Sequence, residues 1–102
     1  MSVYTRNFSE IIGLQIAQTI NYNLCTVKEN DFVAYGIEVI DSFGKTSSKM
    51  YKIQRISCSK DYVLEILKFL YENSVKPDEA PYVVFDILNE KRLLEDSILV
   101  IN

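Results

Sequence analysis

The stretch MYKIQRISCSKDYVLEILKFL, residues 50–70, contains the change of periodicity that decides the fold. Its first part alternates, with Tyr51 and Ile53 on the face opposite Lys52, which predicts a strand over residues 50–56. After Ser57 the spacing becomes helical. Apolar residues now fall three and four apart, at Val63, Ile66, Leu67 and Leu70. We therefore expect a strand followed by an amphipathic helix near residues 59–73, with Ser57 or Ser59 as its cap.

Two further strands are predicted upstream of this stretch. Apolar side chains recur mainly at every second residue over residues 14–25, which predicts a strand. A helix is the competing interpretation, because Ile11, Ile12 and Leu14 precede the alternating residues at a helical spacing. A polar turn at residues 28–31 precedes a second alternating segment at residues 32–40, and Gly44 lies in the following turn. Short connections of this kind favour antiparallel neighbours.

Downstream, Pro77 marks the start of a second helix near residues 78–93. The apolar tail at residues 97–102 is a candidate for a short C-terminal strand. The predicted fold class is α+β, in the order strand, strand, strand, helix, helix, with a three-stranded antiparallel sheet and both helices packed on one face. The expected core is Ile16, Ile20, Ile37, Ile53, Val63, Ile66, Leu67, Leu70, Val84, Ile87 and Leu88.

Length and composition predict a single domain over residues 1–102, with 48% hydrophobic and 25% charged residues. No uninterrupted apolar run reaches the roughly 18 residues of a membrane span, and the N-terminus does not resemble a signal peptide. We therefore expect a cytoplasmic protein without a membrane partner.

The sequence contains no histidine, which removes the commonest general base and transition-metal ligand. The three glycines, at positions 13, 36 and 44, are too far apart to form a glycine-rich phosphate-binding loop. Cys25 and Cys58 are likewise too far apart for a CxxC motif. We predict no catalytic, cofactor-binding or metal-binding residues, no cofactor and no small-molecule ligand, and hence a protein that is not an enzyme. The alternative is a thiol-dependent activity at Cys58, which the dipole of the following helix and Lys60 would make more thiolate-like.

Charge is unevenly distributed along the chain, whose formal net charge is −3. Residues 45–60 contain five basic side chains and no acidic one: Lys45, Lys49, Lys52, Arg55 and Lys60. This candidate basic patch could bind nucleic-acid phosphates, or it could protect an edge strand from aggregation. A third interpretation is that it binds an acidic protein partner or the acidic helices of a second copy. The acidic side chains of the two helices are interpreted as solvated faces.

A three-stranded sheet covered on one side leaves an edge and a face open. The candidate self-association surface consists of Tyr22, Phe32, Ala34 and Tyr35, and a homodimer is predicted. By elimination, we expect a small non-catalytic protein-binding or regulatory module, whose partner is another protein or a second copy. Nucleic-acid binding through residues 45–60 is the alternative.

The second half of the chain resembles a family of small uncharacterised proteins, a domain of unknown function from Gram-positive, largely clostridial bacteria. The resemblance is carried by Tyr35-Gly36-Ile37, by Ile56-Ser57 with the helical residues Val63, Ile66 and Leu67, and by Pro77 with Val83-Val84-x-Asp86-x-Leu88. It covers residues 35–88 and implies a shared organisation without an assigned function. Typical members carry a histidine shortly after the proline, where this chain has Asp78-Glu79-Ala80-Pro81.

Overall fold

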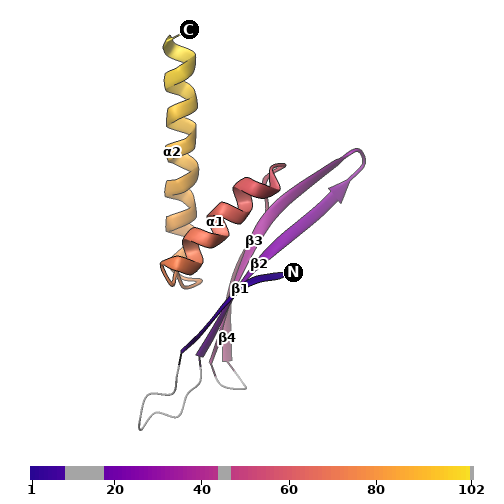
Figure 1. Ribbon diagram of the computed structural model, residues 1–102, viewed down its shortest axis with the longest axis vertical. Helices are drawn as coiled ribbons and strands as arrows, with labels where there is room; N and C mark the ends of the chain where they lie inside the picture. Colours follow the sequence, from indigo (N-terminus) through magenta and orange to yellow (C-terminus); the bar gives the residue numbers. More distant parts are fainter. Residues whose placement is uncertain (9–17, 44–46, 102) are drawn as a thin grey trace.

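The strands form one antiparallel sheet in which sequence neighbours are also spatial neighbours. The computed structural model describes residues 1–8, 18–43 and 47–101, with side chains for residues 1–7, 18–43 and 47–90. The elements are β1 (Ser2–Phe8), β2 (Gln18–Glu29), β3 (Phe32–Phe43), β4 (Ser47–Ser57), α1 (Lys60–Glu72) and α2 (Ala80–Ile101). In Figure 1, α1 lies across one face of the sheet, and α2 projects away from the sheet beyond α1. The predicted α+β class with an antiparallel sheet and two helices is confirmed, but the prediction that both helices pack on one face of the sheet was wrong for α2, which packs mainly on α1.

Within the described part of the chain the sheet has four strands, so the prediction of three was wrong. The additional strand, β1, pairs with β2 through Tyr4↔Tyr22 and Arg6↔Ile20. The sequence does not reveal β1 because Arg6, a charged residue, lies at an inward-facing position and interrupts the alternation of polar and apolar residues. The structure accommodates Arg6 because its guanidinium lies 4.7 Å from the ring centroid of Tyr71 and donates to the Tyr71 carbonyl at 2.9 Å.

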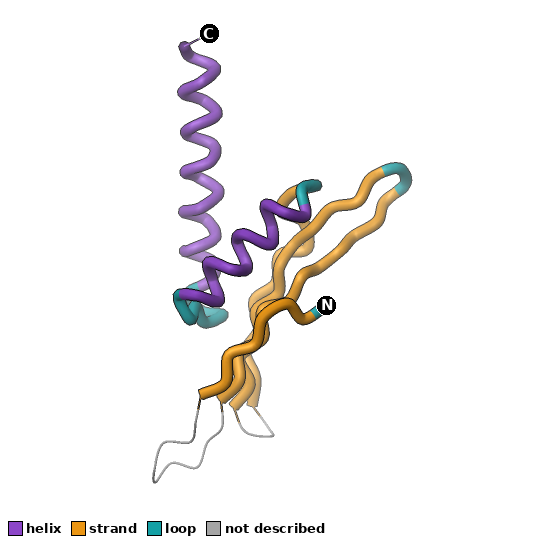
Figure 2. The backbone as a smooth tube through the Cα atoms, viewed as in Figure 1, coloured by secondary structure: helices purple, strands orange, loops and turns teal. Residues whose placement is uncertain are grey.

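The hairpin of β2 and β3 is paired along its whole length, from Gln18↔Phe43 to Glu29↔Phe32. Asn30 takes the positive φ of 47° that its two-residue turn requires, a conformation that asparagine tolerates. The hairpin extends well beyond the end of β1 (Figure 2). The predicted strand at residues 14–25 is confirmed as β2 from Gln18 onward, whereas its first part, including Ile16, and the turn at Gly44 lie outside the described residues.

An irregularity in β4 requires a glycine in β3. Tyr35 pairs with Ser57 and Ile37 pairs with Ile53, so β4 uses more residues than β3 over this interval. The extra backbone of β4 lies against Gly36, where a Cβ atom would overlap the carbonyl oxygens of Ile53 and Gln54. Only glycine allows the two backbones to approach this closely.

The hydrophobic core lies between one face of the sheet and the two helices. Its buried members are Ile20, Tyr22, Leu24, Ile37, Val39, Val63, Ile66, Leu67, Leu70, Val75, Ala80 and Val84. The predicted core residues Ile53, Ile87 and Leu88 pack against this cluster but are only partly buried. All the predicted core residues in the described part of the chain therefore contribute to the core.

A capping serine fixes the start of α1. The length of α2 reflects the lack of helix-breaking residues in its sequence. Ser59 is the N-cap of α1, and its Oγ accepts from the Tyr62 N–H at 3.2 Å. Residues 97–101 continue α2, so the predicted C-terminal strand was wrong. No glycine or proline lies between Tyr82 and Asn102, so nothing in the sequence stops a helix once it has started. The first turns of α2 reach the core through Ala80 and Val84, and the main contacts of α2 are with α1.

Candidate functional site

The two helices meet at their connection, residues 73–79, and open away from it, as Figure 1 shows. Between them lies a groove of about 490 Å³, which we call the helix groove. It is lined by Tyr62, Glu65, Ile66 and Phe69 of α1 and by Val83, Asp86, Ile87 and Glu90 of α2. Each set has the spacing i, i+3, i+4, i+7, so one face of each helix forms one wall.

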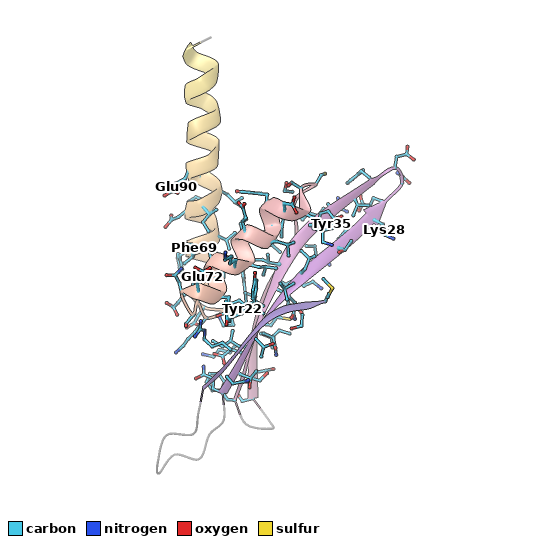
Figure 3. All side chains as sticks on the ribbon, in the orientation of Figure 1. Tyr22, Lys28, Tyr35, Phe69, Glu72 and Glu90 are labelled. Atoms are coloured by element: carbon cyan, nitrogen blue, oxygen red, sulfur yellow. The ribbon has the colours of Figure 1, made fainter. Side chains whose placement is uncertain are left out.

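The floor of the helix groove is apolar and only partly covered. Ile66 is buried, whereas Val83 and Ile87 are half-buried. The Phe69 side chain is 48% exposed. In Figure 3, Phe69 lies on α1 near the junction of the helices, and Glu90 lies further along α2. Apolar side chains held open to solvent between two helices are typical of a site that another molecule covers.

The rim of the helix groove is acidic. Glu65, Asp86 and Glu90 are all exposed, and no basic residue is among the described residues that line the groove. None of the three takes part in an ion pair within the described part of the chain. The nearby Lys68 pairs with Glu72 at 3.8 Å along α1. The rim therefore carries negative charge that the described residues do not neutralise.

Exposed aromatic side chains extend this surface along α2. Tyr82 is 76% and Phe85 63% exposed, and with Pro81 and Asp86 they line a second hollow of about 480 Å³. Asp86 lines both hollows. The apolar surface thus continues from the helix groove around α2.

The sheet face opposite the helices has a different character, and we call it the open sheet face. Its side chains bond to each other across the strands. Thr5 Oγ1 donates to Asn21 Oδ1 at 2.8 Å, and Asn23 Nδ2 donates to Glu38 Oε1 at 2.9 Å. Lys52 Nζ lies 3.9 Å from the other oxygen of Glu38. Each of these side chains is thus engaged with a neighbour, although Asn23 Oδ1 is buried without a hydrogen-bond partner among the described residues.

The basic segment does not form one patch among the described residues. Lys52 pairs with Glu38, and Arg55 pairs with Glu29. Lys49 lies opposite the buried Asp41 in the register of β3 and β4, and alternation places it on the sheet face opposite Lys52. Lys60 is exposed at the first residue of α1, and Lys45 lies outside the described residues.

The four residues of the candidate self-association surface are not brought together on one surface. Tyr22 is buried under α1, its hydroxyl donates to the Val75 carbonyl at 2.9 Å, and burial raises its pKa to about 12. Tyr35 is half-buried and packs against the core. Phe32 and Ala34 alternate onto the other face, where Ala34 is buried and Phe32 is 46% exposed.

The two cysteines differ in environment. Cys58 is exposed just before the N-cap of α1, whereas Cys25 is half-buried in β2. Burial raises the pKa of the Cys25 thiol, although Lys52 acts in the opposite direction.

In residues 1–8, 18–43 and 47–101, no three histidine, cysteine or acidic side chains gather as metal ligands would. No helix in the described part of the chain is both long and apolar enough to cross a membrane.

The helix groove was not predicted from the sequence. Its apolar residues were assigned to core stripes and its acidic residues to solvated faces. One signal could have revealed it. In both helices an acidic residue directly precedes an apolar one within the stripe, as in Glu65-Ile66 and Asp86-Ile87.

Comparison with known proteins adds the family of the chain. No curated protein and no solved structure matches the sequence. A model of a family of unknown function, DUF6514, matches residues 8–90, which include all eight residues of the helix groove. The chain therefore belongs to the family DUF6514.

Proposed function

We propose that the protein is a small, non-catalytic binding module that acts in regulation by holding another protein in the helix groove. The observation that carries this proposal is the exposure of Phe69 between two helical walls. Asp86 connects this groove to the hollow that the exposed Tyr82 and Phe85 line. Aromatic side chains in partly covered hollows contribute most of the binding energy in many protein interfaces.

The contrast with the open sheet face also supports the helix groove as the binding surface. There, Asn23, Glu38 and Lys52 are engaged with each other, so a ligand would have to displace existing interactions. In the helix groove the apolar walls gain by being covered, at about 25 cal/mol per Å² of apolar area removed from water.

The test compares two phenylalanines of nearly equal exposure, Phe69 in the groove at 48% and Phe32 at the end of the hairpin at 46%. The full chain and its variants Phe69→Ser and Phe32→Ser are immobilised and exposed to lysate of the native cell. Retained proteins are identified by mass spectrometry and then tested again in purified form. We expect a protein that the wild type and Phe32→Ser retain and that Phe69→Ser loses.

A parallel arm with nuclease addresses the competing function. If the basic segment of residues 45–60 binds nucleic acid, the protein would retain nucleic acid and would lose its protein partners after nuclease treatment. That result, or equal retention by both phenylalanine variants, would contradict the proposed function. The cytoplasmic location and the homodimer stay predictions.

A further inference from the structure

We propose that the occupant of the helix groove is an amphipathic helix of a partner protein, with lysine or arginine on both sides of its apolar stripe. This inference rests on the proposed function and specifies the class of partner. It follows from the helical walls of the groove and from the negative charge of its rim. It also follows from the repulsion that two copies of the chain would meet if they paired groove against groove.

The walls favour a helix over an extended segment. An extended peptide needs free backbone groups to bond with, as at the edge of a sheet. Residues 62–69 and 83–90 lie inside α1 and α2, where backbone N–H and C=O groups bond within their own helix. The groove therefore offers side chains only, and it suits a segment whose own backbone is already satisfied.

The shape of the groove also fits a third helix. Each wall repeats at i, i+3, i+4, i+7, which is the ridge pattern that interdigitates with the side chains of another helix. Phe69 and Ile87 lie on opposite walls and would contact the apolar stripe of such a helix from both sides. Ile66 would form the floor beneath it.

The rim determines the charge of the partner. Glu65 stands on one wall, and Asp86 and Glu90 stand on the other, so a bound helix meets carboxylates on both flanks. An apolar helix without charge would leave them partly desolvated, and an acidic helix would be repelled. Basic side chains at the flanks satisfy them, while phosphate groups of a nucleic acid or a phospholipid are repelled.

A second copy of the chain is a poor occupant. A two-fold pairing of groove against groove would set Glu65, Asp86 and Glu90 against the same carboxylates of the partner. Lys49, Lys52 and Arg55 belong to β4, a strand hydrogen-bonded within the sheet, and cannot supply a helix. The lysines of α1 belong to a helix that already packs on its own sheet, and the two basic residues of α2 stand among four acidic ones in the same helix.

The experiment uses a defined probe and the full chain. The probe is a labelled helical peptide of about 15 residues, long enough for four turns. It carries leucine at i, i+3, i+4, i+7, lysine on both flanks and alanine elsewhere, and its counterpart carries glutamate in place of lysine. Fluorescence anisotropy gives the Kd of each peptide at low and at high salt.

We expect the lysine peptide to bind at least tenfold more tightly than the glutamate peptide, and its binding to weaken as salt screens the rim. Neutralising the rim with Glu65→Gln, Asp86→Asn and Glu90→Gln together should weaken the lysine peptide about tenfold, at two- to threefold for each exposed ion pair. The matched control neutralises three exposed carboxylates elsewhere, Asp31→Asn, Asp78→Asn and Glu79→Gln, and should change Kd less than about twofold. Phe69→Ser should abolish binding of both peptides.

Each contrary result has a distinct meaning. Equal affinity for the two peptides, with loss of both in Phe69→Ser, overturns the inferred charge of the partner and leaves the proposed function standing. Binding of neither peptide overturns the inference, and the Phe69 and Phe32 comparison in lysate then decides the proposed function separately. A dimer in sedimentation that Phe69→Ser dissociates makes a second copy the occupant, and this also overturns the inference.

Discussion

The open sheet face and the helix groove are both uncovered in this chain and both carry an exposed phenylalanine, but they differ in how their charged and polar side chains are engaged. On the open sheet face, polar groups such as Asn23 and Glu38 have found partners in the neighbouring strands. In the helix groove, apolar groups such as Phe69 remain exposed, and the carboxylate of Glu90 has no ion-pair partner among the described residues. On the open sheet face, covering the surface would break interactions that the polar side chains already make. In the helix groove it would not, so the helix groove is the better candidate for binding.

The difference follows from the elements that form each surface. Neighbouring strands place side chains directly opposite one another, so Thr5 meets Asn21 and Asn23 meets Glu38 across the sheet. The two helices open away from their connection, so the side chains that face each other move out of contact along the groove. Four tests sharpen this comparison.

The largest expected effect is on the open sheet face, at Gly36. Gly36→Ala places a Cβ against the backbone of Ile53 and Gln54, which cannot move without breaking the pairing of β3 and β4. We expect a loss of about 3 kcal/mol in the free energy of unfolding, the upper part of the range for overpacking. Urea denaturation measures it. Asn21→Ala, on the same face, serves as the control and should cost less than about 1 kcal/mol; equal losses would contradict the close backbone approach.

The second effect concerns the layer between the two surfaces, where Tyr22 is buried under α1. Its hydroxyl loses a proton near pH 10 in the unfolded chain and near pH 12 in the folded chain, because burial disfavours the phenolate. The folded state binds more protons between these values, so the free energy of unfolding falls as pH rises, by about 1.4 kcal/mol per pH unit. Near neutral pH, Tyr22 is protonated in both the folded and the unfolded chain, so it should not make the free energy of unfolding depend on pH there.

Tyr22→Phe isolates this contribution in denaturation curves measured from about pH 8 to 12. The variant should lose about 1 kcal/mol at neutral pH, because the Val75 carbonyl loses its donor, and should show a shallower decline at high pH. Parallel declines for the variant and the wild type would show that Tyr22 does not titrate in this range.

The third test applies the same chemical change to both surfaces. Glu38→Gln weakens the bridge from Asn23 to Lys52 and should cost about 1 kcal/mol of stability. Glu90→Gln removes a carboxylate that has no ion-pair partner in the described part of the chain, and should change stability by less than about 0.5 kcal/mol. Thermal unfolding of the two variants at equal salt gives the comparison. A larger cost at Glu90 would reverse the distinction between the surfaces.

The smallest effect on stability is expected at the cysteines. Cys58→Ser should leave the free energy of unfolding within about 0.5 kcal/mol, because Cys58 is exposed. Mass spectrometry during alkylation near pH 8 should show Cys58 modified before Cys25, whose thiol is half-buried and has a raised pKa. Faster modification of Cys25 would mean that the open sheet face is less closed than its hydrogen bonds indicate. A rate at Cys58 well above that of free cysteine would support the thiol-dependent alternative.

The sequence predicted those elements in which local pattern and tertiary environment agree. Alternation revealed β2, β3 and β4, and helical spacing with Ser59 revealed α1. It failed at β1, where Arg6 faces inward against Tyr71, a residue 65 positions away in the chain. It failed again at residues 97–101, because a short apolar run fits a strand or a buried helix equally well.

The sequence by itself determined the class of the fold, the absence of histidine chemistry and the residues that each element turns inward. These properties depend on residue types and on the spacing of neighbours along the chain, and the inward residues were determined for every element except β1. Only the tertiary structure decided which of those residues remain uncovered. Phe69 and Ile66 belong to the same apolar stripe of α1, yet Ile66 is buried and Phe69 is exposed. That outcome depends on the direction in which α2 leaves the connection at residues 73–79, which sets how much of α1 it covers. No spacing within either helix contains that direction.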